Sequence, residues 1–239
     1  MPNSIFKRGT GSLNLPALFY KLNSNGSKLR IPVYMKTIDG QVRIDYHSSG
    51  GSTDPDVPDV PEVTKKVFSG YADWSGSFRN SSGKGTAKSN YSDESDRLNI
   101  YQARYGTYYH LGVMCFKSIF EQVRAYGGTV TNVTLRIKNL HCYSSAGLNT
   151  KICGAWNMPN NKPSTFSFDD VKSTAYCTAH FAKSTSKTLT LDDNARKNIQ
   201  NGTMDGFRLL SATGFKTTDY GYFAGTGSSR PYIEITVEK

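Results

Sequence analysis

The sequence predicts an all-β protein whose larger part is a sandwich of two sheets. Residues 129–140, TVTNVTLRIKNL, alternate between apolar and polar side chains, as expected for a strand with one buried face and one solvent face. The same alternation closes the chain at 233–238. Strands of this kind need a second apolar layer to cover the buried face. The 22 glycines, 15 tyrosines and 12 phenylalanines among 239 residues are also typical of β proteins.

Residues 1–47 are predicted to form a small β meander. Three short apolar stretches are separated by Asn25-Gly26 and Asp39-Gly40, pairs that favour the positive φ angles of hairpin turns. Three short strands cannot bury their own apolar side chains. The segment is therefore predicted either to dock on another protein or another copy of itself, or to fold back onto the rest of the chain. The residues predicted for docking are Leu18, Phe19, Ile31, Val33, Val42 and Ile44.

A domain boundary is predicted at 48–63, SSGGSTDPDVPDVPEV. Glycine and serine favour a flexible chain, and the repeated steps before proline favour an extended one. The stretch contains acidic residues and no basic residue. It is therefore predicted to link the meander to a single β domain that covers 64–239.

The elements of this domain follow from its apolar patterns. Strands are predicted at 65–68, 111–116, 129–140, 151–156, 188–191, 207–210, 221–223 and 232–237. The second of these is apolar on both faces, which predicts a central strand. A short helical crossing is predicted at 118–125, and a helix at 194–200 that Asp192 or Asp193 caps and Gly202 ends. The Ser-, Gly-, Asn- and Lys-rich stretch 76–95 predicts a long surface loop.

The charge and cysteine content limit the kinds of partner and compartment. The net charge is +10 and the isoelectric point is near 9.4, but lysine and arginine are scattered and form no nucleic-acid motif. No apolar run approaches the roughly 18 residues that span a bilayer, and the first residues lack the apolar core of a secretory signal. The four cysteines are expected to be reduced, with a Cys142–Cys153 bridge as the alternative.

The sequence carries no motif for catalysis or for a cofactor. Cys177 and His180 could join His141 and Cys142 in a zinc site, but the second pair is adjacent and points to opposite faces of a strand. Neither a G-x-S-x-G nor an H-E-x-x-H motif occurs. No pair of carboxylates stands out as the two that glycoside hydrolysis requires. We therefore expect no metal, no cofactor and no enzymatic activity.

Aromatic residues beside predicted loops indicate contact with sugars. A sugar ring stacks its C–H face on an aromatic ring, and neighbouring polar groups hold its hydroxyls. Loops of a sandwich present such groups on a rigid frame. The competing interpretation is that many of these rings fill the core. The residues predicted to bind a glycan are Trp74, Tyr105, Tyr109, Trp156 and Tyr222.

Five stretches of the C-terminal domain together resemble a known group of folds. They are QARYG at 102–106, HLGVMCF at 110–116, TVTNVTLRIKN at 129–139, LTLDDNARKNIQNG at 189–202 and RPYIEITVEK at 230–239. In this order they resemble the jelly-roll sandwiches of the disaggregatase-related type, relatives of carbohydrate-binding modules. Similar domains occur at the C-terminal ends of phage minor tail proteins and other virion proteins. The resemblance implies a jelly roll over 64–239 and a place on a bacteriophage virion.

These observations lead to one expected function and two alternatives. The chain is expected to be a non-enzymatic virion protein, such as a head fibre, decoration or minor tail component, assembled in the host cytoplasm. Its expected partners are capsid or tail proteins, further copies of itself and a host cell-surface polysaccharide, but not a membrane or nucleic acid. The alternatives are a free carbohydrate-binding or lectin-like module and, third, a glycan-cleaving enzyme.

Overall fold

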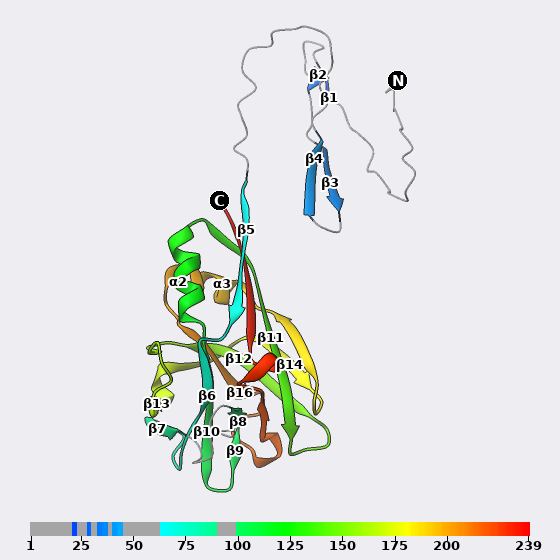
Figure 1. The fold of residues 1–239 in the computed structure, drawn as a ribbon. Helices are drawn as coiled ribbons and strands as arrows, with labels where there is room; N and C mark the ends of the chain where they lie inside the picture. Colours follow the sequence, from blue (N-terminus) through cyan, green and yellow to red (C-terminus); the bar gives the residue numbers. More distant parts are fainter. Residues whose placement is uncertain (1–20, 23–27, 30–32, 38–39, 45–62, 90–98) are drawn as a thin grey trace. The chain divides into compact units, whose positions relative to one another are not determined.

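The computed structural model describes residues 21–22, 28–29, 33–37, 40–44, 63–89 and 99–239. The chain divides into two units, Met1–Val60 and Pro61–Lys239 (Figure 1).

The first unit contains two pairs of antiparallel strands. Strand β1 (Lys21–Leu22) pairs with β2 (Lys28–Leu29), and β3 (Val33–Thr37) pairs with β4 (Gly40–Ile44). The β3–β4 register agrees with the hairpin predicted around Asp39-Gly40. Three predicted docking residues, Val33, Val42 and Ile44, lie on β3 and β4. Leu18, Phe19, Ile31 and the linker residues 48–62 lie outside the described residues.

In its described residues the second unit consists of two antiparallel sheets and two α-helices, which confirms the all-β class. The larger sheet contains β6 (Trp74–Asn80), β7 (Thr86–Ser89), β9 (Arg104–Tyr105), β10 (Tyr108–Cys115), β12 (Leu148–Ala155), β13 (Thr165–Ser167), β14 (Val171–Phe181) and β16 (Gly206–Ser211). The smaller sheet contains β5 (Lys65–Tyr71), β8 (Ile100–Gln102), β11 (Thr129–Cys142), β15 (Ser186–Thr190), β17 (Gly221–Phe223) and β18 (Tyr232–Glu238).

Both predicted helices of this unit are present and have clear end signals. Helix α2 (Lys117–Tyr126) begins where the Asp73 carboxylate accepts a hydrogen bond from the backbone N–H of Ser118 at 2.9 Å. Helix α3 (Asp193–Asn201) begins at Asp192, whose carboxylate accepts from the N–H of Ala195, and ends at Gly202 with φ of +68°. Among the described residues, no helix is long and apolar enough to cross a membrane.

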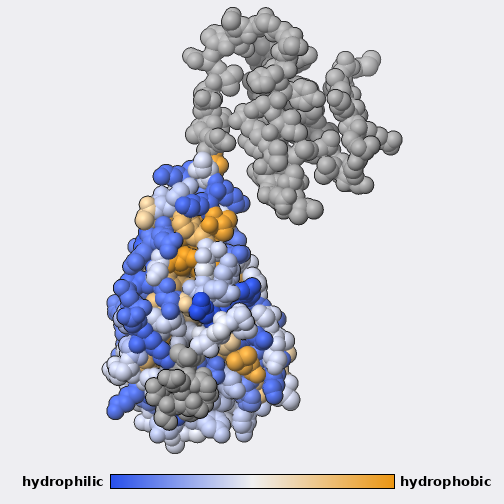
Figure 2. All heavy atoms as spheres, viewed as in Figure 1, coloured by the Kyte–Doolittle hydropathy of each residue, from blue (hydrophilic) through white to orange (hydrophobic). Residues whose placement is uncertain are grey.

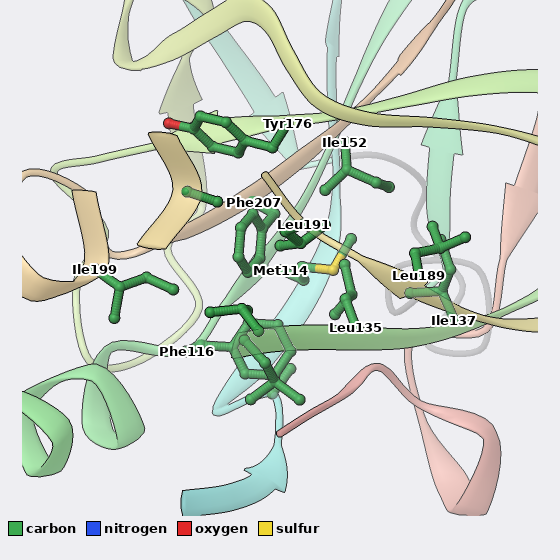
Figure 3. Close-up of a cluster of buried hydrophobic side chains, with 14 of the residues drawn as sticks. Met114, Phe116, Leu135, Ile137, Ile152, Tyr176, Leu189, Leu191, Ile199 and Phe207 are labelled. Carbon is green, nitrogen blue, oxygen red and sulfur yellow. The ribbon is translucent and has the colours of Figure 1, made fainter. Parts of the chain in front are cut away.

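The central strand β10 separates two apolar clusters because its side chains alternate between its faces. Met114 and Phe116 belong to the main core between the sheets, while Val113 and Cys115 belong to a second cluster on the opposite face of the larger sheet. Figure 3 shows the main core, in which side chains of β10, β11, β12, β15, β16 and α3 converge. Residues 111–116 were predicted to be apolar on both faces, and the two clusters explain why.

The prediction of a long surface loop at 76–95 is wrong for its first part. Strands β6 and β7 occupy much of this stretch; residues 90–95 lie outside the described residues. The small residues of β6 are buried, and their hydroxyls are satisfied: Ser75 donates to the carbonyl of Gly225 at 2.7 Å, and Ser77 accepts from the N–H of Tyr101 at 2.6 Å. The serines suggested a polar loop in the sequence, but in the fold their hydroxyls form hydrogen bonds to backbone groups of distant segments, so the strand can be buried.

Strand β11 runs the length of the second unit and defines its two ends. Its first residue, Thr129, pairs with Glu238, which in turn pairs with Lys65, so the chain enters the unit and reaches Lys239 at the same end. Its last residue, Cys142, pairs with Gly221 at the opposite end. At about 3.3 Å per residue, these ends are roughly 40 Å apart. The face seen in Figure 2 is mostly hydrophilic, with apolar patches that include one near β5.

Candidate functional site

Exposed tyrosines gather at the end of the second unit that lies away from Lys65. Tyr105 is 51% exposed, Tyr108 is 42% exposed and Tyr143 is 58% exposed. Among the described residues only six large hydrophobic side chains are exposed, and these three tyrosines are half of them. Tyr105 and Tyr108 face each other across the β9–β10 hairpin, and Tyr143 follows β11. We call these three side chains the tyrosine surface.

A continuous row of aromatic rings supports the tyrosine surface. From one end to the other, the centroid distances are 5.2 Å for His141–Tyr222, 4.9 Å for Tyr222–Tyr101, 5.8 Å for Tyr101–Tyr220, 4.8 Å for Tyr220–Tyr105 and 6.5 Å for Tyr105–Tyr143. Tyr101 and Tyr220 are buried. Tyr105 and Tyr143 therefore rest on a packed layer and keep fixed orientations.

Asp219 joins this row to a buried polar network. Its backbone carbonyl accepts from the Gln102 amide at 3.0 Å, and the Gln102 oxygen accepts from the Thr150 hydroxyl at 2.7 Å. Its carboxylate accepts from the hydroxyls of Ser211, at 3.0 Å, and Thr213. Asp219 directly precedes Tyr220. These hydrogen bonds therefore fix the turn that places Tyr220, and Tyr222 of β17 after it, in the row.

His110 lies behind the row and is neutral at pH 7. It is 1% exposed, and its ring centroid lies 5.5 Å from those of both Tyr101 and Tyr220. Burial, together with the positive charge of Arg79, lowers the pKa of His110 to about 4. Arg79 itself lies over the Tyr108 ring, with its Cζ 4.4 Å from the ring centroid. The layer behind the tyrosines is thus uncharged, and a cation flanks one exposed ring.

The β9–β10 hairpin carries a second aromatic pair on its other face. Tyr109 is paired with Arg104 in the register, and the Arg104 guanidinium lies over the Tyr109 ring at 5.2 Å. The Tyr109 ring also meets Phe215 at 5.1 Å. Of the predicted glycan-binding residues, Tyr105 and Tyr222 therefore belong to the tyrosine surface and its supporting row, while Tyr109 lies on the reverse side of the same hairpin.

The two predicted tryptophans lie elsewhere. Trp74 pairs with Cys115, at the end of β10 that lies away from the hairpin. Its indole N–H donates to the carbonyl of Pro159 at 2.8 Å, and its ring is buried against Phe78 and Phe166. This geometry gives Trp74 a packing role, because its faces are not available to a ligand.

Trp156 is also separated from the tyrosine surface. It follows β12 at the end where Ala155 pairs with Gly206, and Lys172 lies over its ring at 5.7 Å. Sequence reasoning, in contrast, missed Tyr143. The Ser-Ser-Ala-Gly turn that follows Tyr143 directly after a strand is the signal that could have identified it.

The described residues give this end no cluster of metal ligands. No group of three or more His, Cys, Asp or Glu residues is placed to hold a metal ion in the part of the chain that the structure describes. His180 instead pairs with Asn149 at 3.2 Å, and all four cysteines are free. What the surface offers is aromatic faces beside carboxylate, hydroxyl and guanidinium groups, a combination suited to stacking and hydrogen bonding of a polar ring.

Comparison with known proteins adds no relative. No protein-family model matches the chain, and the curated proteins include no significant match to it.

Proposed function

We propose that this chain is a non-enzymatic structural protein of a bacteriophage virion that presents its second unit to a carbohydrate of the host surface. The observation that carries the carbohydrate part is the tyrosine surface: three exposed rings, two of them joined to a packed aromatic row, roughly 40 Å from the point where the chain enters the unit. A ligand at that end meets the second unit opposite the end where β5 begins at Lys65. The virion part rests on the resemblance of 64–239 to domains of virion proteins.

The first unit is proposed to attach the protein to capsid or tail proteins or to further copies of itself. Its support is the number of apolar residues in a segment of short strand pairs, which stay marginal without additional packing. The excess of basic residues in 1–47 favours an acidic partner surface.

The carbohydrate part is tested by binding of the full chain to purified cell-wall polysaccharides. Tyr105→Ala and Tyr143→Ala should each weaken binding about tenfold, since loss of one stacked ring removes roughly 1 kcal/mol or more. Tyr71→Ala is the matched control, because Tyr71 is 39% exposed but lies on β5. Equal losses in all three variants, or no binding by the parent protein, would contradict the proposal.

The virion part is tested by the neighbouring genes. Capsid, portal or tail genes next to this one would support it. A neighbourhood of secreted glycan-degrading enzymes would instead favour the free carbohydrate-binding module.

A further inference from the structure

Arg208 is a buried cation on the face of the larger sheet that points away from the other sheet. It lies opposite Val113 on one neighbouring strand and opposite Cys153 on the other. Val113 belongs to the second apolar cluster, whereas Phe207, the residue before Arg208, belongs to the main core. Only 6% of Arg208 is exposed.

The described residues supply no anion for this cation. The Arg208 Nε has no hydrogen-bond partner among them, and the Cζ lies 5.8 Å from the ring centroids of both Phe168 and Phe215. The thiol of Cys153 lies opposite Arg208 on the neighbouring strand and acts on its pKa, but burial raises the pKa of this thiol to about 11, so it is neutral at pH 7. The guanidinium thus faces two aromatic rings and an uncharged thiol.

This environment is unfavourable for the cation when nothing else is bound. Burial lowers the pKa of Arg208 to about 10, so the side chain still carries its charge at neutral pH. A buried charge without a counter-ion and a buried donor without an acceptor both destabilise a fold. A carboxylate or sulfate group would satisfy both needs, because its oxygens match the planar donors of a guanidinium.

Phe215 provides a way into the site. Phe168 is buried and belongs to the short helix η1 (Phe168–Asp170), whereas Phe215 is half-buried and lies in the connection between β16 and η2 (Thr217–Asp219). Of the two rings over Arg208, Phe215 is therefore the one that can move without disturbing the sheet. Its other neighbour is Tyr109, on the hairpin that also carries the tyrosine surface.

We propose that Arg208 binds one oxyanion group, the carboxylate or sulfate ester of an acidic polysaccharide, and that Phe215 covers the site when it is empty. The polysaccharide as the source of the anion rests on the proposed function, whereas binding of the anion itself does not. A polymer that passes from Tyr105 to the Tyr109 side of the β9–β10 hairpin would reach Phe215, the ring that lies over both Tyr109 and Arg208.

The anion is tested with sodium glucuronate against thermal unfolding of the full chain at constant ionic strength, with glucose as the uncharged probe. At ten times its dissociation constant, glucuronate should raise the unfolding midpoint by roughly 3 °C or more. Glucose should not. Arg208→Gln should abolish the shift, whereas Arg136→Gln, which removes an exposed arginine that lies over Tyr232, should keep it. No shift in the parent protein, or an equal shift in Arg208→Gln, overturns the proposal.

A second variant keeps the test decisive if Arg208→Gln does not fold. Phe215→Ala should bind glucuronate at least threefold more tightly, because no ring has to move. An unchanged affinity would contradict the proposal that Phe215 covers the empty site.

Polysaccharide binding separates the proposed function from the proposed Arg208 site. Tyr105→Ala should weaken binding of the polysaccharide about tenfold but keep the glucuronate shift. A protein that binds glucuronate but no polysaccharide would refute the proposed function alone, and one that binds polysaccharide without a glucuronate shift would refute the Arg208 site alone.

Discussion

Gly112 of β10 lies directly against the backbone of Tyr101 in β8: a Cβ atom at Gly112 would lie 2.3 Å from the carbonyl oxygen of Tyr101. The two strands belong to different sheets. The absence of a side chain at Gly112 therefore allows the sheets to approach at the place where Tyr101 enters the aromatic row.

Gly112→Ala should consequently destabilise the second unit and displace the aromatic row. The added methyl group meets backbone atoms and the Ile100 side chain at 2.8 Å, and overpacking of this kind costs about 1–3 kcal/mol. Chemical denaturation gives the loss, and tyrosine near-ultraviolet circular dichroism reports the row. Gly106→Ala is a control for the general effect of the substitution, since nothing lies within 4 Å of a Cβ there, although its φ of +57° adds local strain. Equal stability of Gly112→Ala and the parent would refute the close approach.

Trp74→Ala should reduce stability rather than ligand binding. The ring is buried among Phe78 and Phe166 and its N–H is bonded to Pro159. Truncation of a buried tryptophan costs about 3–5 kcal/mol. If the variant keeps its unfolding free energy but loses affinity for polysaccharide, the ring belongs to the binding surface after all.

The stability of the fold should decrease as the pH falls from about 6.5 to about 4. The pKa of His110 is about 4 in the folded protein and 6.5 in the unfolded chain, so in this window the unfolded chain binds a proton that the folded protein does not. This difference between the two pKa values corresponds to a loss of about 3 kcal/mol in the free energy of unfolding. Above pH 6.5 the imidazole is neutral in both states and contributes no slope.

Comparison with His110→Gln isolates this contribution, because both proteins share all carboxylates. The unfolding free energies of the two proteins should converge as the pH falls through the window, since only the parent has a histidine to protonate. Parallel pH profiles would show that His110 is not held neutral by its surroundings.

The native thiols should react slowly with Ellman's reagent at pH 8. Burial raises the pKa of Cys115 to about 12 and that of Cys153 to about 11, and it also raises the pKa of Cys142. Cys177 is the one cysteine that is not fully buried. We expect at most one thiol to react in the native state and four after unfolding, with Cys177→Ser removing the native signal. Fast reaction of two or more native thiols would contradict the packing described here.

Deletion of residues 1–48 should leave a folded sandwich, since the second unit contains both apolar clusters and both sheets. The truncated protein should unfold cooperatively near the temperature of the full chain. According to the proposed attachment, it should no longer join particles or self-associate. Normal incorporation of the truncated protein would move the docking surface to the sandwich.

The sequence was informative where a pattern is local. The alternation in 129–140 predicts β11, and the Asp192-Asp193 pair and Gly202 predict the two ends of α3, where Asp192 is the residue that caps it. It was less informative where a residue depends on distant contacts. Ser77 was predicted to be a loop residue because the partner of its hydroxyl, the carbonyl of Asn99, lies 22 positions away.

The candidate site shows the same limit. Tyr105 and Trp74 look alike in sequence, since each is an aromatic residue near small or polar neighbours. Only the pairing of strands shows that Tyr105 lies on an exposed hairpin, whereas Trp74 is buried and bonded to the carbonyl of Pro159. Arg208 had no local signal at all, because its burial depends on Phe168 and Phe215 from two separate connections.

The position of β5 has a mechanical consequence. The chain enters the unit at the start of β5, and all of Lys65–Tyr71 pairs with Tyr232–Glu238 through hydrogen bonds perpendicular to the strands. Tension applied between the incoming chain and the tyrosine end of the unit acts along β5. The force is then shared by the whole ladder in shear and does not open the pairs one at a time, so the sandwich should resist tension in this direction better than tension that peels β5 sideways.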